Sequence, residues 1–307
     1  MSHSQIKETD FEPIHYEQSD AERIAGESTS FWKDAWRRFK QNKLAIIGII
    51  VILLLTIMSL TGTMISGQNY SDNDLLNANQ SPSLEHWFGT DHLGRDLFAR
   101  TWYGARISLF IGLMAAFLDL IIGVIWGTIA GYLGGRVDEY MMRIADILSG
   151  VPYLLVVILL MVIMPAGLWT LIIAMTITGW IGMARIVRGE VLKLKAEEFV
   201  MASRSLGAST TRIISKHLIP NALGAILVTL TLTIPTAIFT EAFLSFLGLG
   251  VPAPKASWGT MTSDALSSLR YYPYQLFFPA FFICLTMLAF NVVGDGMRDA
   301  LDPKDRR

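Results

Sequence analysis

Cysteine and charged residues are both scarce in this sequence, and each scarcity excludes a class of protein. Cys284 is the only cysteine among 307 residues, so an intrachain disulfide and a cysteine-based metal site are excluded. Charged residues make up 17% of the chain, below the quarter or so that is usual in soluble domains. The formal net charge of −1 gives no support to nucleic-acid binding.

The short motifs of ATP-splitting and hydrolytic enzymes are also missing. Without Gly-x-x-x-x-Gly-Lys-Ser/Thr, the chain is not expected to hydrolyse ATP by itself. It has neither His-Glu-x-x-His nor Gly-x-Ser-x-Gly, so we expect no catalytic residue and no enzyme activity. His86 and His92 lack a third clustered metal ligand, so we expect no metal site and no cofactor in this chain. Instead, we expect residues 91–96 to form a polar turn whose side chains hydrogen-bond within the turn.

Long apolar runs dominate what is present. The mean hydropathy is +0.44, and 52% of the residues are hydrophobic. A helix needs about 20 such residues to cross a hydrocarbon core of about 30 Å. The runs that come close to or exceed this length are 44–65, 107–132, 147–165, 168–187, 222–247 and 276–293. The sequence therefore predicts an all-α integral membrane protein with six transmembrane helices.

The segments around these runs complete the predicted organisation. The polar, acid-rich residues 1–30 predict a disordered cytosolic arm, and 31–43 interleave aromatic and basic residues as an interfacial amphipathic helix does. The remaining predicted parts are the first transmembrane helix 44–65, an extracytoplasmic loop 66–104, a core 105–297 with five spans and a loop over 188–220, and a cytosolic tail 298–307.

Basic residues predict the orientation of the chain in the membrane. Five lie in 31–43 and six in 188–220, whereas the loop 66–104 has only Arg95 and Arg100. Because Lys and Arg near the ends of spans favour the cytosolic side, we expect both termini and the loop 188–220 in the cytosol.

The polar interval between the runs 168–187 and 222–247 predicts a helix, a glycine and a second helix. One helix face is apolar at Phe199, Ala202 and Leu206, the period of an α-helix. Gly207 stands at the C-cap position and is expected to have a positive φ. Ser209 or Thr210 can N-cap the second helix, and Pro220 is expected to end that helix and to begin the next membrane span. Such a projection suits a groove on a soluble partner.

Three alternatives remain open for this interval. It can be an amphipathic loop on the lipid headgroups or a plain connection between two helices. A DNA-binding helix-turn-helix is disfavoured because both ends run directly into membrane spans.

Two acidic residues and a glycine repeat lie within the predicted spans. A carboxylate that faces lipid costs several kcal/mol, so Asp119 and Glu241 are expected to face a partner helix or a path through the membrane. A buried or neutral acid is the alternative for Asp119. Gly123, Gly127 and Gly131 repeat every four residues, which predicts close packing against another helix.

The interval 197–220 resembles the cytoplasmic coupling loop of ABC-importer permeases, Glu-Ala-Ala, three residues, Gly, nine residues, Ile, one residue, Leu-Pro. The matching positions are Met201, Ala202, Ser203, Gly207, His217, Ile219 and Pro220, with departures at Met201, Ser203, His217 and Ile219. Three further stretches, 86–109, 241–259 and 288–303, resemble the C-type permease subunit of the peptide and nickel group. The likeness covers about 31–303.

This resemblance implies a type I ABC-importer permease fold with a cytoplasmic coupling helix, in a multi-pass protein of the bacterial cell membrane. The implied partners are a homologous B-type permease, two cytosolic ABC ATPases that bind ATP and Mg, an extracytoplasmic solute-binding lipoprotein or periplasmic protein, and the lipid bilayer. Oligopeptides or dipeptides are the expected substrates. The alternatives are nickel or another small solute, and an ion-coupled secondary transporter.

The resemblance also assigns roles to residues. ATPase coupling is expected from Phe199, Met201, Ala202, Ser203, Arg204, Leu206, Gly207, Ala208 and Ser209. Independently of the resemblance, the position of Asp119 and Glu241 within apolar spans leads us to expect that they line the translocation path.

Overall fold

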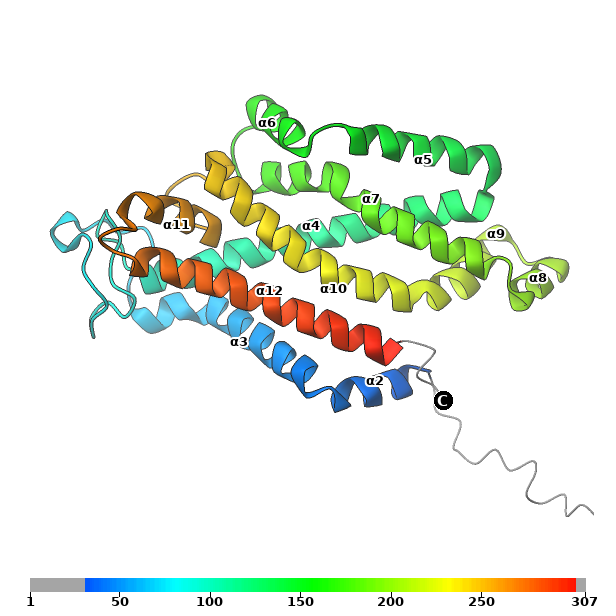
Figure 1. Ribbon diagram of the computed structural model, residues 1–307, viewed down its shortest axis with the longest axis horizontal. Coiled ribbons are helices and arrows are strands. Elements are labelled where there is room, and N and C mark those ends of the chain that lie inside the picture. The colour runs from blue at the N-terminus through cyan, green and yellow to red at the C-terminus, as the bar shows by residue number, and fades with distance from the viewer. Residues whose placement is uncertain (1–30, 302–307) are drawn as a thin grey trace, which may run out of the picture.

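The computed structural model describes residues 31–301. Within that range the secondary-structure elements are helices, and there is no β-strand (Figure 1). The predicted arm 1–30 and residues 302–307 of the predicted tail lie outside the described residues. The α-helices are α2 Phe31–Gln41, α3 Lys43–Ser66, α4 Leu97–Leu133, α5 Gly135–Gly150, α6 Tyr153–Ile163, α7 Leu168–Leu194, α8 Glu198–Ser205, α9 Thr210–Ile213, α10 Ile219–Leu244, α11 Trp258–Ala265 and α12 Tyr274–Leu301.

Five helical stretches within this range are long and apolar enough to cross a membrane. They are α3, α4, α7, the continuous stretch Thr210–Leu249 that contains α10, and α12. The all-helical membrane fold is therefore confirmed. A sixth crossing exists only if α5 and α6 count together as one broken span, because the two helices meet at 81°.

The region 147–165, predicted as one transmembrane helix, is not a single continuous helix. The helical hydrogen bonding stops at Gly150, Val151 is extended with φ −81° and ψ 127°, and α6 starts after Pro152. Proline cannot donate a backbone hydrogen bond and disfavours the helical conformation in the preceding residue. The 11 residues of α6 span only about 16 Å at 1.5 Å per residue, about half of a hydrocarbon core.

The predicted start of the second span also needs correction. α4 begins at Leu97, not at residue 107, so the preceding loop ends at Asp96 and not at 104. The Asp96 side chain accepts a hydrogen bond from the Ala99 backbone N–H at 2.7 Å and caps the helix. The first turns contain Arg100, which is buried and lies 3.4 Å from an Asp91 oxygen. This ion pair permits a charged residue in a buried helix, which a search for apolar runs cannot find.

α4 and α7 pack side by side through the repeated glycines of α4 (Figure 1). A Cβ added at Gly123 would lie 2.9 Å from the Trp180 carbonyl oxygen, and one at Gly131 would lie 3.0 Å from the Arg188 carbonyl oxygen. Gly127 faces the Ala184 carbonyl oxygen even more closely. The predicted close packing is confirmed, and its partner is the backbone of α7.

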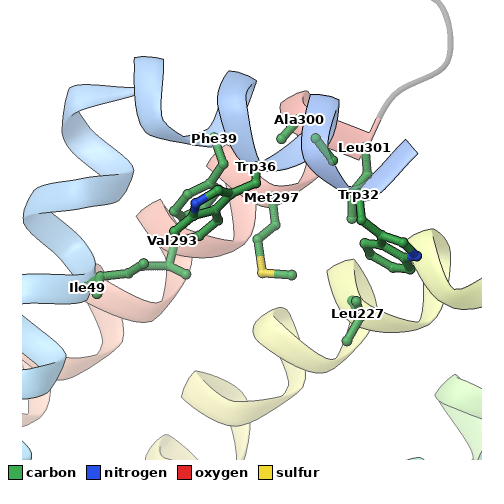
Figure 2. A pocket seen from close by; sticks show the side chains of 10 residues that line it. Trp32, Trp36, Phe39, Ile49, Leu227, Val293, Met297, Ala300 and Leu301 are labelled. Atoms are coloured by element: carbon green, nitrogen blue, oxygen red, sulfur yellow. The ribbon is translucent and has the colours of Figure 1, made fainter. Parts of the chain in front are cut away.

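The predicted interfacial helix corresponds to α2, which lies across the end of α12 (Figure 1). Ala35 and Phe39 are buried, and Phe39 belongs to a cluster with residues of α3 and α12. Trp32 and Trp36 are exposed and border an apolar pocket of about 210 Å³ between α2, α10 and α12 (Figure 2). This arrangement places aromatic surface next to basic side chains, as expected at a membrane interface.

The contact between α4 and α7 can be tested with two matched alanine substitutions. Gly127→Ala places a methyl group against backbone that cannot move aside independently, and such overpacking costs about 1–3 kcal/mol. Gly182→Ala adds the same group to α7 where nothing lies within 4 Å. We expect Gly127→Ala to lower the thermal unfolding midpoint of the purified protein and Gly182→Ala to leave it unchanged or raise it. Equal midpoints would contradict the close approach.

Candidate functional site

The first part of the site is the segment 197–220, which joins α7 to α10. Gly207 ends α8 with φ +80°, so the predicted positive φ is confirmed. The Ser209 side chain, not that of Thr210, caps α9 by accepting a hydrogen bond from the Arg212 backbone N–H at 3.3 Å. The expectation that Pro220 ends this helix is wrong. The chain continues through the π-helical turn Ile214–Leu218 into α10 without a break, and Pro220 lies in the first turn of α10, so it does begin the next span.

Most of the predicted coupling residues are exposed at one end of the helical bundle. Figure 1 shows α8 and α9 at that end, opposite α11 and the loop that precedes α4. The exposed fractions of Phe199, Met201 and Leu206 are 42%, 52% and 88%. Ala202, Arg204, Gly207 and Ser209 are also exposed, and Ser203 and Ala208 are half-buried. The segment therefore presents exposed apolar side chains at its outer surface, among them Phe199, whose ring lies 6.1 Å from the His217 ring.

The inner face of the same segment is anchored in the bundle. Val200 and Ile213 are buried in a cluster with Val187 and Val191 of α7 and with Ala222 of α10. The Ser203 hydroxyl lies 3.3 Å from His217 Nε2. The segment is thus fixed to both of the helices that it joins.

A cavity of about 490 Å³ lies between this segment and the end of α4. Residues of its wall that the sequence did not single out include Tyr132, Leu133, Lys195 and Ala196. The Lys195 ammonium donates a hydrogen bond to the Gly131 carbonyl oxygen at 2.7 Å. A lysine just after a helix with a glycine-rich neighbour is too common a pattern to have predicted this contact.

The second part of the site is a cavity of about 240 Å³ within the bundle. Its wall contains Ala115, Asp119, Tyr153, Met175, Thr178, Gly179, Thr233, Thr236, Ala237 and Thr240. These residues come from α4, α6, α7 and α10. Asp119 is 5% exposed, and its Oδ1 has no hydrogen-bond partner within the described part of the chain; the same holds for the Tyr153 hydroxyl.

Glu241, the other predicted path residue, has a different environment. It is fully buried and accepts hydrogen bonds from the Ser108 hydroxyl at 2.9 Å and the Ser245 hydroxyl at 2.7 Å. Ser108 in turn accepts a hydrogen bond from the Trp258 backbone N–H at 3.1 Å. Glu241 therefore ties α4, α10 and α11 together, and the structure does not bring it to the cavity of Asp119.

The polar turn before α4 is satisfied by its own side chains, as predicted. The Arg95 guanidinium donates to Asp91 Oδ2 at 2.7 Å, and His86 Nδ1 lies 2.9 Å from Asp96 Oδ2. Residues 31–301 contain no group of three or more His, Cys, Asp or Glu side chains that could hold a metal ion.

The two buried acids allow a direct comparison of structural and unpartnered carboxyl groups. Glu241→Gln replaces an acceptor oxygen with an amide donor beside two serine hydroxyls, so we expect a loss of about 1 kcal/mol or more in unfolding free energy. Asp119→Asn removes no hydrogen bond to Oδ1 and is expected to leave the free energy unchanged or raise it. Thermal unfolding of the two purified variants measures the difference, and a larger loss for Asp119→Asn would show that this reading of the two sites is wrong.

Comparison with known proteins places this geometry among transport proteins. The family model of the binding-protein-dependent transport system inner membrane component matches residues 123–307. A model of the N-terminal TM domain of oligopeptide transport permease C matches residues 30–82.

Curated relatives match nearly the whole chain. It is 66% identical over 297 residues to the oligopeptide transport system permease protein OppC of Bacillus subtilis, covering 97% of each chain. It is 56% identical over 306 residues to the dipeptide transport system permease protein DppC of Bacillus subtilis, covering 99% of this chain and 96% of the relative. The OppC protein of Escherichia coli K12 is 43% identical over 288 residues, covering 93% and 95%.

A solved structure of similar fold is an inward-facing MetNI methionine ABC transporter, which aligns with a TM-score of 0.52 and 18% identity over 65% of this chain and 94% of that chain. At this identity the likeness concerns the fold alone.

Proposed function

The chain belongs to the oligopeptide and dipeptide permease family of binding-protein-dependent ABC importers, and from this premise we propose that it is one membrane subunit of an ATP-driven peptide importer. The single observation that carries peptide as the substrate is the 66% identity to an oligopeptide permease over 97% of both chains. Nickel or another small solute is the less favoured substrate, because the relatives compared above are named for peptides.

The partners follow from this class of machine. We assign to it a homologous B-type permease, two cytosolic ATPases that bind ATP and Mg, and an extracytoplasmic solute-binding lipoprotein or periplasmic protein. Thr236 and Gly179 at the Asp119 cavity are exposed in this chain, which supports a second permease that closes the cavity. The chain lies in the bacterial cell membrane with both termini in the cytosol, a placement supported by the basic residues of 31–43 and 188–220.

The segment α8–Gly207–α9 is the proposed contact with one ATPase. Its exposed apolar residues Phe199, Met201 and Leu206 suit a hydrophobic groove on a soluble partner. The rest of the predicted set, Ala202, Ser203, Arg204, Gly207, Ala208 and Ser209, surrounds them in sequence. Because Val200 and Ile213 are fixed in the bundle, a force on the outer face reaches α7 and α10 and is not absorbed by a loose loop.

The connection from this segment to the cavity is short and helical. α7 runs from the segment back to Thr178 and Gly179, and α10 runs from it to Thr233, Thr236 and Thr240. Thr233 is 14 residues beyond the start of α10, about 21 Å along a helix. Closure of the ATPases would thus displace two walls of the cavity together, which is the mechanical requirement of alternating access.

An ion-coupled transporter would also use a buried acid such as Asp119. Such a transporter needs no exposed helix-Gly-helix segment, so the segment favours the ATP-driven machine. Reconstitution separates the two: vesicles that contain the complete set of proposed subunits should accumulate peptide only with ATP, and uptake driven by an ion gradient in the absence of the ATPases would refute the proposal.

Gly207 provides a test of coupling with a matched control. A β-branched side chain at φ +80° strains the turn by roughly 1 kcal/mol or more, so Gly207→Val should lower peptide uptake per ATP hydrolysed. Gly67→Val introduces comparable strain at φ +65°, also with nothing within 4 Å, but at the opposite end of α3 from α2. It should leave the ratio of uptake to hydrolysis unchanged. The ratio is measured in proteoliposomes, and equal ratios in both variants would count against the role of Gly207.

A further inference from the structure

The Asp119 carboxyl group lies buried with one oxygen that has no hydrogen-bond partner within residues 31–301. Asp119 is 95% buried, since its exposed fraction is 5%, and its Oδ1 meets no hydrogen-bond donor within residues 31–301. None of the ion pairs within those residues includes it. A buried carboxyl group in this condition is costly, and Glu241 shows that the fold can satisfy a buried acid fully. The described part of the chain therefore leaves Asp119 Oδ1 with capacity for a further donor.

The hydroxyl groups of α10 around this position are restricted to accepting hydrogen bonds. Each donates its one hydrogen to a carbonyl oxygen one turn earlier in the helix. The bonds are Thr233 to Thr229 at 2.9 Å, Thr236 to Leu232 at 3.0 Å and Thr240 to Thr236 at 2.8 Å. Their lone pairs remain free, so this wall of the cavity offers acceptors in a row at i, i+3 and i+7.

The opposite walls add a phenol and a hydroxyl with free capacity. The Tyr153 hydroxyl on α6 is buried without a partner, and Thr178 on α7 lies at the same cavity. Gly179 makes room for the carboxyl group, because a Cβ there would lie 2.7 Å from Asp119 Oδ1. The cavity, at about 240 Å³, far exceeds the ~10–15 Å³ needed for one water molecule.

A buried carboxyl group and several acceptors around one space match a ligand with a positive charge and several donors. A primary ammonium group has three N–H donors and no acceptor, and its hydrogen bond to a carboxylate is among the stronger ones in proteins. We propose that this cavity binds the N-terminal ammonium group of the peptide during its passage. The inference rests on the proposed function, and it explains how one site can serve peptides of many sequences, since the terminal ammonium is common to them.

The proposal can be tested without relying on transport, by the reactivity of a cysteine at the cavity. In the assembled complex, the background variant Cys284→Ser removes the native exposed cysteine, and Thr236→Cys adds one at the exposed edge of the cavity. Three methanethiosulfonate reagents are compared: an aminoethyl reagent with a primary ammonium, a trimethylammonium-ethyl reagent with the charge but no N–H, and a neutral hydroxyethyl reagent. Reaction rates are measured with Asp119 and with Asp119→Asn.

We expect the rate ratio of the aminoethyl to the hydroxyethyl reagent to fall about tenfold or more on Asp119→Asn, as the loss of a charge-assisted hydrogen bond requires. The trimethylammonium reagent should show a much smaller fall. An unchanged ratio would overturn the proposal. Equal falls for both cationic reagents would also overturn it, because the cavity would then attract charge without recognising an ammonium group.

Uptake gives a second measurement with a control on the same helix. Thr128 of α4 is buried with an unpartnered hydroxyl and does not line the cavity. In proteoliposomes that contain all proposed subunits, Asp119→Asn should lower kcat/KM for trialanine uptake about tenfold or more, and Thr128→Val should leave it unchanged. Equal uptake by Asp119→Asn and the wild type would overturn the inference alone. A wild-type complex that takes up no peptide would overturn the proposed function, and the labelling ratios would still decide whether the cavity selects ammonium.

Discussion

The direct approach of the α4 and α7 backbones is the constraint on which the other features of this structure depend. Gly123, Gly127 and Gly131 place one helix against the carbonyl oxygens of the other, so neither helix can slide or tilt without the other. α4 carries Asp119 into the cavity, and α7 continues from the cavity wall to the segment around Gly207. A rigid pair of helices thus connects a buried polar space to an exposed apolar surface.

The two buried acids show how this fold separates structural from unsatisfied polar groups. Glu241 is surrounded by donors from α4 and the turn after α10, and the bond from Trp258 to Ser108 extends that network to α11. Asp119 has an open space instead of a donor. A native protein tolerates such a group where stability is given up for function. The contrast between these two carboxyl groups, and not the presence of an acid in a membrane helix, is what points to a ligand.

Apolar patterning predicted those parts of the structure that hydropathy and local conformation determine. The helices α3, α7 and α12, the close packing of the glycine repeat and the positive φ of Gly207 were all accessible from residue type and spacing. The break at Pro152 was not, because counting apolar residues gives 147–165 the length of a span whether or not its backbone is continuous. Counting apolar residues missed the first turns of α4 because they contain the charged Arg100. The charge of Arg100 is compensated by Asp91, which lies in the loop before α4 and outside the apolar run.

The cavity could be predicted only in part. Asp119 stands out in any apolar run, and the spacing of Thr233, Thr236 and Thr240 on one helix face was a signal that a search for charged residues overlooks. Tyr153 lines the same cavity as these threonines because the chain bends between α5 and α6. This bend is a tertiary feature that no local sequence pattern contains. In the sequence, Glu241 and Asp119 look alike, because each is an acidic residue within an apolar run. Only the positions of Ser108 and Ser245 in the structure distinguish Glu241 from Asp119.

The central claim is that the segment α8–Gly207–α9 is held by a separate ATPase. Cross-linking from Ala202→Cys, an exposed position in α8, to single cysteines in the groove of the ATPase tests this claim most directly. Leu133→Cys, exposed at the end of α4, provides a second position near the segment. The account predicts rapid cross-linking from Ala202→Cys in the intact complex and a rate that changes when nucleotide binds. Failure of Ala202→Cys to react with any groove cysteine in a well-assembled complex would contradict it.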